Sequence, residues 1–244
     1  MTLMDSDISV IVPFYNEEKY LEQSISRLIA TDLFKKIILV NDDSNDKSRQ
    51  IAELMCEKYE YIQLLNLEKQ KGKGNAIRVG LEHVKTSHLI VHDADLEYFP
   101  SDIPEMFEVS KRNPQSLVIG SRTIGTKNRN NKYKLTYYGN KILTSFFSLI
   151  NFYFVSDIAS CYWLIETEVL KNLELKENGF AIEVEVLSKF LKTENKIFEV
   201  PINYDGRLFS EGKKIKIQDG LNIFIKIIKY SKFLSFFKFR NIKN

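Results

Sequence analysis

Three carboxylates alternate in the segment DADLE, where Asp93, Asp95 and Glu97 are separated by single residues. In extended backbone this spacing directs all three side chains to one side, so their like charges repel unless a cation lies between them. Hard oxygen ligands of this kind suit Mg²⁺ or Mn²⁺, and such an ion commonly also binds substrate phosphates. The segment therefore predicts a divalent metal site. The alternative is a solvated acidic loop, or a helix cap before residues 100–111.

Two further carboxylates, Asp42 and Asp43, follow the apolar run over residues 35–41. An Asp at the end of a strand can accept hydrogen bonds from a base or a ribose. Asp46 is expected to cap the helix that follows. Capping remains the alternative interpretation for all three residues.

The segment KGKGNA (71–76) combines two glycines with two lysines. The glycines permit close approach of the backbone, and the lysines add positive charge, as in turns that hold a phosphate. The GxxxxGK[ST] spacing is absent, as is GxGxxG after the first strand. The sequence therefore lacks the principal motif of a Walker-type ATPase and that of a dinucleotide dehydrogenase.

Positive charge gathers in two other segments. From Arg122 to Lys141 the chain has six basic residues and no acidic one, so this segment could hold an anion; the alternative is a solvated surface loop. In the second segment, Arg207 together with Lys213 and Lys214 could fold over bound phosphates.

The longest uncharged stretch, residues 142–156, is too short to span a bilayer, which takes roughly 20 apolar residues. We expect a buried or interfacial helix there. Asp157 follows directly, and a lone carboxylate at the edge of a buried segment suggests a catalytic role, although by itself this signal is weak.

These residues need a scaffold, and the chain supplies short apolar runs that alternate with segments of helical periodicity. The alternation predicts an α/β fold, Rossmann-like, with a mostly parallel sheet covered by helices on both faces. Ligands bind such sheets outside the carboxyl ends of the strands, where the acidic and glycine–lysine segments stand. The expected strands are residues 8–13, 35–41, 61–67, 88–93 and 116–121.

Composition limits the alternatives. The chain has 244 residues, 44% of them hydrophobic, which suffices for one domain with a sizeable core. Its net charge of +3 argues against a general nucleic-acid binder, and two cysteines cannot form a disulfide framework, so a reducing cytosol fits. We expect a catalytic domain over residues 1–217 and a basic tail over 218–244.

The tail predicts an amphipathic helix over residues 218–239. Lys226, Lys229 and Lys232 fall within one arc of that helix, and apolar side chains occupy much of the rest. This pattern is typical of a helix that lies on a membrane surface. The alternative is a helix that packs its apolar face on the body of the protein or on a second subunit.

Taken in order, the motifs resemble those of family 2 glycosyltransferases of GT-A fold, and within them the dolichyl-phosphate mannosyltransferase-like group. The resemblance extends over roughly residues 8–230. It is carried by VIVPFYNEE, VNDDSND, KGKGNA, DADLEYFPSDIP, IGSR, SDIASCYWLI, GFAIEVE, EVPINYDGR and EGKKIKIQDG.

The resemblance implies roles for individual residues. Asp93, Asp95 and Glu97 would bind the metal and the donor diphosphate, and Asp157, Arg122 and Asp95 would be the catalytic group. The implied donor-binding residues are Pro13, Tyr15, Glu17, Asp42, Lys73, Asp93, Ala94, Asp95, Arg122, Arg207 and Lys213.

The implied reaction moves a sugar from a GDP- or UDP-sugar to a polyprenyl phosphate, with inversion and with Mg²⁺ or Mn²⁺ as cofactor. The protein would work at the cytoplasmic face of a membrane without spanning it and without a nucleic-acid partner. The resemblance does not decide whether it forms a homo-oligomer. A glycan hydroxyl as acceptor is an alternative, with Asp157 as its general base. The other alternative functions are a sugar-1-phosphate nucleotidyltransferase and a non-catalytic nucleotide-sugar sensor or membrane scaffold.

Overall fold

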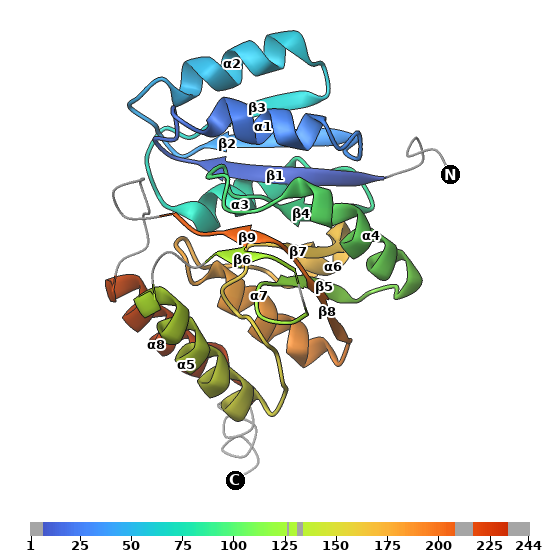
Figure 1. Cartoon of the computed structure of the whole chain (residues 1–244), viewed down its shortest axis with the longest axis vertical. Helices are drawn as coiled ribbons and strands as arrows, with labels where there is room; N and C mark the ends of the chain where they lie inside the picture. The colour runs from blue at the N-terminus through green and yellow to red at the C-terminus, as the bar shows by residue number, and fades with distance from the viewer. Residues whose placement is uncertain (1–6, 126, 131–133, 208–216, 234–244) are drawn as a thin grey trace.

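The fold is built around one twisted sheet. The structure is a computed structural model that describes residues 7–125, 127–130, 134–207 and 217–233 (Figure 1). Seven strands form the sheet in the order β3-β2-β1-β4-β7-β5-β8, and a two-stranded sheet pairs β6 with β9. The strands are β1 (Ile8–Phe14), β2 (Lys36–Asn41), β3 (Ile62–Asn66), β4 (His88–Val91), β5 (Leu117–Ser121), β6 (Arg129–Asn130), β7 (Trp163–Glu166), β8 (Ile197–Pro201) and β9 (Tyr204–Asp205).

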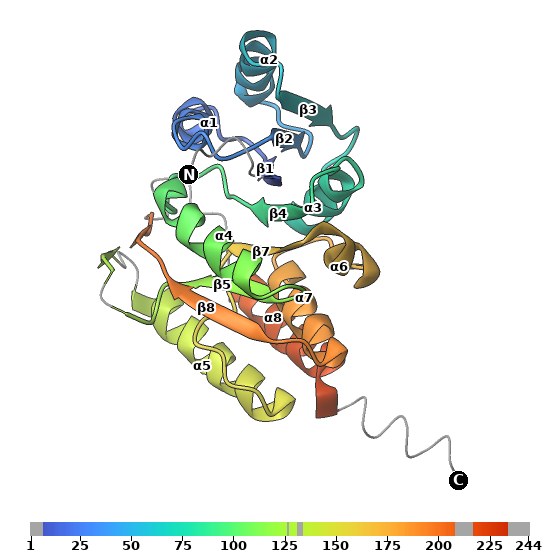
Figure 2. The same cartoon turned by 90° about the vertical axis from the view of Figure 1, so that its right-hand side faces the viewer.

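Helices cover both faces of the large sheet, as Figure 2 shows. Side chains that alternate along a strand point to opposite faces, so Val10 and Val12 pack with α1, α2 and α4, whereas Ile11 packs on the other side with α3, α6 and α7. The helices are α1 (Leu21–Ile29), α2 (Ser48–Lys58), α3 (Lys73–Glu82), α4 (Ile103–Arg112), α5 (Lys134–Asn151), α6 (Thr167–Asn172), α7 (Ile182–Phe190) and α8 (Ile217–Tyr230), with short 3₁₀ turns η2 (Pro100–Asp102) and η3 (Leu191–Thr193).

The expected α/β architecture is confirmed. Each of the five predicted strands is present, and β1, β2, β3 and β4 pair in parallel. Strand β7 is the exception, because it runs antiparallel to both of its neighbours, β4 and β5. The parallel strands bring their carboxyl ends to one edge of the sheet, and the segments after β1, β2 and β4 therefore meet there.

Helix α8 lies beside α5 at the end of the molecule away from α2, in both views (Figures 1 and 2). One face of α8 packs inward, where Ile223 and Ile227 join the core, and the ring of Phe224 stacks on Phe146 of α5 at 4.7 Å. The helix ends at Tyr230 and is shorter than the expected span to residue 239, of which residues 234–239 lie outside the described part of the chain. None of the described helices is long and apolar enough to cross a membrane.

Candidate active site

Lys73 joins two acidic residues at the start of α3. Its ammonium group lies 2.8 Å from Asp93, which follows β4, and 2.8 Å from Glu183 at the start of α7. Burial alone would lower the pKa of Lys73, but Asp93 and Glu183 outweigh that effect and raise it well above its usual range. Burial likewise favours the neutral form of Asp93, yet Lys73 keeps the pKa of that carboxyl below its usual value. Lys73 and Asp93 therefore form a charged, fixed pair.

A second cluster forms around Arg207. Its guanidinium group contacts Asp95 at 3.0 Å and Glu17 at 3.2 Å, and its backbone N–H donates to Glu97 at 2.8 Å. The hydroxyl of Tyr204 donates to the other oxygen of Glu97. Burial, together with the charges of Glu97 and Asp93, raises the pKa of Asp95 to about 7 despite Arg207. Three carboxylates, those of Glu17, Asp95 and Glu97, thus surround the single guanidinium group of Arg207, which favours a bound cation there.

The three predicted metal ligands divide between these two clusters. Asp93 faces Lys73, whereas Asp95 and Glu97 face Arg207. Within the described ranges, no three His, Cys, Asp or Glu side chains are grouped as a metal cluster. The chemistry of the donor set nevertheless suits Mg²⁺ or Mn²⁺, because Asp93, Asp95 and Glu97 all offer carboxylate oxygens, the ligands that these ions prefer.

Asp42 fixes the turn that presents Lys73. Its two oxygens accept the backbone N–H groups of Lys71 at 2.9 Å and Gly72 at 2.7 Å. Gly72 has φ of +102°, and a Cβ atom there would lie 2.7 Å from the carbonyl oxygen of Asn178. The sequence predicts a turn whose glycines let a phosphate approach closely; in this structure the backbone of the segment before α7 approaches Gly72 instead.

The turn after β1 carries the remaining donor-side residues. The backbone N–H of Glu17 donates to Ser48 at 2.8 Å, which ties this turn to the start of α2. Asp46 is not the N-cap of α2 as predicted, because Lys47 holds that position; Asp46 lies one residue earlier and accepts the N–H of Ser48 at 2.9 Å. Pro13 is buried near the end of β1, and Ala94 is buried in the turn that follows β4.

Arg122 and Asp157 form a bidentate ion pair. Arg122 follows β5, and its Nε and Nη2 atoms lie 2.7 and 2.8 Å from the two oxygens of Asp157, which is fully buried. Asn140 of α5 donates to the same carboxylate at 2.8 Å. Burial favours the neutral form of Asp157, but Arg122 outweighs it and keeps the pKa below the usual range. Both oxygens are therefore charged and occupied.

Arg129 adds a second guanidinium group beside Arg122. It donates to the carbonyl oxygen of Arg122 at 2.7 Å and stacks over the ring of Tyr137 at 4.6 Å, and the ammonium group of Lys141 lies 4.8 Å from that ring. The Nε atom of Arg129 is buried and has no hydrogen-bond partner among the described residues. With Asp157 engaged by Arg122, this cluster carries excess positive charge and is suited to an anion.

Tyr204 connects the acidic and the basic halves of the site. Its hydroxyl contacts Glu97, and the guanidinium carbon of Arg122 lies 4.9 Å above its ring. The predicted residues are thus brought to one edge of the sheet in two adjoining groups. Tyr15 lies in the turn after β1, and Lys213 lies outside the described residues.

Sequence reasoning had not assigned site roles to Glu183, Arg129, Asn140 and Tyr204. A signal existed for three of them, because Glu183 stands in GFAIEVE, Arg129 in the segment of six basic residues and Tyr204 in EVPINYDGR. Asn140 gave no signal, since an Asn within a helix-forming segment is ordinarily a surface residue.

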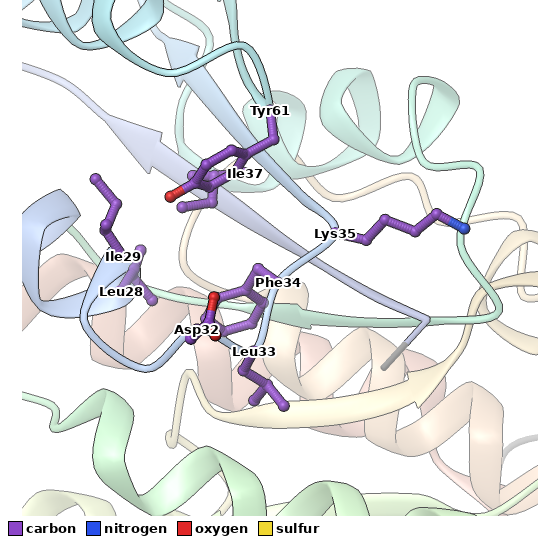
Figure 3. A pocket seen from close by; sticks show the side chains of 8 residues that line it. All are labelled: Leu28, Ile29, Asp32, Leu33, Phe34, Lys35, Ile37 and Tyr61. Carbon is purple, nitrogen blue, oxygen red and sulfur yellow. The ribbon is translucent and has the colours of Figure 1, made fainter. Parts of the chain in front are cut away.

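A separate pocket lies at the opposite edge of the sheet, between the end of α1 and the start of β2 (Figure 3). It contains none of the predicted site residues, and it lies at the amino end of β2, away from the edge where ligands bind in sheets of this kind. It is therefore not the candidate site. Its lining residues are Leu28, Ile29, Asp32, Leu33, Phe34, Lys35, Ile37 and Tyr61.

The chain is similar to known proteins over most of its length. Residues 9–174 match the sequence model of the family described as glycosyl transferase family 2. A dolichol-phosphate mannosyltransferase of Pyrococcus furiosus is 32% identical over 211 residues, which are 84% of this chain and 58% of that protein. The chain thus spans somewhat more than half the length of that relative.

Two further comparisons extend the likeness. A dolichyl-phosphate beta-glucosyltransferase of Trichomonas vaginalis is 27% identical over 93% of this chain and 73% of its own length. Among solved structures, glucosyl-3-phosphoglycerate synthase from Mycobacterium tuberculosis, in complex with Mn²⁺, uridine diphosphate and phosphoglyceric acid, superposes with a TM-score of 0.72. The superposition covers 94% of this chain and 81% of the mycobacterial chain at 15% sequence identity, which establishes the shared fold.

Proposed function

The chain belongs to glycosyl transferase family 2, and on that premise we propose that it transfers a sugar, with inversion, from a nucleoside diphosphate sugar to a polyprenyl phosphate. The observation that carries this proposal is the pairing of Arg122 with Asp157 next to Arg129. The site thereby offers positive charge for an anionic acceptor, while the carboxylate that could have served as a base is already engaged.

On the donor side, the carboxylates at the ends of β1 and β4 would receive the nucleoside diphosphate. Asp95 would be the principal metal ligand, with Asp93 or Glu97 beside it, and a bound Mg²⁺ or Mn²⁺ would neutralise the charge of the leaving diphosphate. Lys73 lies at this end of the site, where its pairing with Asp93 and Glu183 would keep the Asp93 carboxylate charged and fixed in place. Mn²⁺ and uridine diphosphate in the mycobacterial neighbour support this arrangement.

On the acceptor side, the chemistry needs orientation more than it needs a base. A phosphate monoester has a second pKa of about 6, so it is already a nucleophile near neutral pH. Arg122 and Arg129 would hold it so that one phosphate oxygen forms a bond to the anomeric carbon as the bond to the diphosphate breaks on the opposite face. A glycan hydroxyl would instead need a free base, and Asp157 is occupied by Arg122 and Asn140.

The names of the relatives support a lipid acceptor. The Pyrococcus relative is a dolichol-phosphate mannosyltransferase and the Trichomonas relative a dolichyl-phosphate beta-glucosyltransferase. A polyprenyl chain resides in a bilayer, so the protein would act as a peripheral protein at the cytoplasmic face of a membrane. The donor would be a GDP- or UDP-sugar.

The test is to incubate the purified protein with Mg²⁺ or Mn²⁺, a GDP- or UDP-hexose and a polyprenyl phosphate. Mass spectrometry should detect the glycosylated lipid phosphate, and one nucleoside diphosphate should be released for each product. Release of pyrophosphate would instead indicate a nucleotidyltransferase. Transfer to an oligosaccharide with no transfer to the lipid phosphate would overturn the assignment of the acceptor.

A further inference from the structure

Helix α5 presents a row of large apolar side chains to the outside. Leu135, Tyr138, Ile142 and Leu149 are between 58% and 70% exposed, although each is large enough to belong in a core. Their spacing of three, four and seven residues places them on one face of the helix. Phe147 is buried on another face of the helix, so the exposed row is not caused by poor packing of α5.

Helix α8 continues this apolar surface. Leu221, Phe224, Ile225 and Ile228 are between 38% and 63% exposed, while other residues of the same helix are in the core. The stacked rings of Phe146 and Phe224 join the two helices, which lie side by side in Figure 2. We call these eight exposed residues of α5 and α8 the α5–α8 face. Monomers rarely expose contiguous apolar patches above a few hundred Å².

The charges that α5 and α8 themselves place beside the α5–α8 face are mainly positive, and Glu177 faces α8 from the body of the protein, where it pairs with Lys226 and Lys229. Helix α5 contains no Asp or Glu and α8 contains only Asp219. Lys141 on α5 is exposed, and the side chain of Lys229 on α8 is 53% exposed. Anionic headgroups would be attracted to these lysines. A second copy docked through the same face would instead oppose its lysines to those of the first.

The same helix also connects the apolar row to the acceptor cluster. Tyr137 lies against Arg129 and Lys141, and its ring packs at 5.2 Å on that of Tyr138, the next residue and a member of the apolar row. A lipid phosphate could therefore meet the cationic cluster while its hydrocarbon chain stays on the apolar side of α5. This adjacency favours a lipid bilayer over a soluble protein partner.

We propose that the α5–α8 face is the surface through which the protein docks on an anionic lipid bilayer. The proposal rests on the proposed function, because the lipid acceptor supplies the reason for docking. It differs from the interpretation based on the tail alone, since α5 contributes half of the face and two of the α8 lysines, Lys226 and Lys229, contact Glu177.

The test compares the variant Ile142→Gln/Leu149→Gln with Leu54→Gln, a matched control on α2 in which the original side chain is 63% exposed at the far end of the molecule. The probe is co-sedimentation with phosphatidylcholine vesicles with and without phosphatidylglycerol. The wild type and the control should bind the anionic vesicles in a salt-sensitive manner, and the double variant should bind about tenfold or more weakly. Equal binding of all three proteins would overturn the proposal, as would a wild-type dimer that the double variant dissociates and that ignores vesicles.

Transfer assays separate this inference from the proposed function. The double variant should lose activity toward a polyprenyl phosphate embedded in anionic vesicles by about tenfold, yet retain wild-type activity toward a short, water-soluble prenyl phosphate. Loss of both activities in a folded double variant would contradict the docking role. If the wild type transfers sugar to neither acceptor, the proposed function fails, and vesicle binding alone then decides the docking surface.

Discussion

Asp157 receives the guanidinium group of Arg122 through both carboxylate oxygens, at 2.7 and 2.8 Å. Asn140 occupies one of these oxygens as well. A buried carboxylate that is held in its charged form by a bidentate Arg keeps that Arg in one orientation. A carboxylate held in this way is poorly placed to take a proton from a substrate. Asp157 thus positions the group that would bind the acceptor phosphate.

The first prediction concerns Asp157→Asn. The amide can accept from only one of the two guanidinium donors, so Arg122 should lose its fixed orientation and transfer should slow by about 10-fold to 100-fold. Donor affinity should stay near the wild-type value. The pH–rate profile should keep its shape, whereas removing a general base would abolish the limb on which that base becomes protonated.

Breaking a buried ion pair costs stability, about 3–5 kcal/mol. Thermal unfolding and donor binding should therefore be measured on the same Asp157→Asn sample. Asn140→Ala is the matched control, because it removes one donor to the carboxylate and leaves the ion pair intact. A folded Asp157→Asn protein with the wild-type transfer rate would exclude the positioning role.

Five of the nine described strands, β1 to β5, could be predicted because buried strands appear as short apolar runs, and the candidate site was expected at the ends of those runs. The contacts that the residues of the site make with one another could not be predicted. Glu17 and Arg207 are 190 positions apart in sequence and meet only through the order of the strands. The same holds for Glu97 and Tyr204, which are 107 positions apart. No local pattern encodes contacts of this kind, because they depend on how the whole chain folds.

The direction of strand β7 in the sheet could likewise not be predicted from the sequence. Three of its four residues, Trp163, Leu164 and Ile165, end the segment SDIASCYWLI that contains Asp157, and their apolar character indicates burial without giving a direction. The chain leaves β5, passes through α5 and enters β7 antiparallel to both β4 and β5. The position of Arg122 opposite Asp157 depends on this path of the chain, and so do the contacts of Asn140.

The second prediction distinguishes the role of Asp95 in metal binding from its effect on the stability of the fold. Asp95 has its pKa raised to about 7 by burial and by the neighbouring Glu97 and Asp93. A group whose ionised form is disfavoured in the folded state destabilises that state at neutral pH, so Asp95→Asn should leave the metal-free protein at least as stable as the wild type. Donor affinity in the presence of Mg²⁺ or Mn²⁺ should nevertheless fall by about tenfold or more.

Calorimetric titration with UDP- and GDP-sugars, with metal and with EDTA, checks this prediction. Asp32→Asn is a suitable control, because Asp32 lies at the opposite edge of the sheet, in the pocket of Figure 3. The metal assignment is wrong if EDTA and Asp95→Asn both leave donor affinity unchanged.

The third prediction concerns the close approach of two backbones at Gly74. A Cβ atom at this position would lie 2.5 Å from the carbonyl oxygen of Glu177, which cannot move aside as a flexible side chain would. Gly74→Ala should destabilise the protein by about 1–3 kcal/mol in urea unfolding. Gly139→Ala is the control, since a Cβ there has no neighbour within 4 Å and Ala suits the interior of α5 better, by about 0.5–1 kcal/mol. Equal stabilities of the two variants would contradict this interpretation.

The last prediction concerns the docking of α8 and its dependence on pH. Glu177 accepts hydrogen bonds from Lys226 at 2.7 Å and from Tyr230 at 2.6 Å, both on α8. Burial favours the neutral acid, but these donors outweigh it and lower the pKa of Glu177 below its ordinary value of 4.5. The stabilisation is therefore fully present above pH 4.5 and is lost as the pH falls through the lower pKa of the folded protein.

Glu177→Gln should accordingly be less stable than the wild type at neutral pH, by about 1–2 kcal/mol, and the difference should vanish in acid. Urea unfolding over a pH series measures the difference. Hydrogen exchange of the α8 amides should be faster in the variant at neutral pH, because a neutral amide at position 177 holds Lys226 and Tyr230 less tightly on the body of the protein. Glu168→Gln is the control, since Glu168 is 78% exposed and pairs with Lys171 within α6. A stability difference between wild type and Glu177→Gln that stays constant down to pH about 3 would show that the charge of Glu177 does not hold α8 in place.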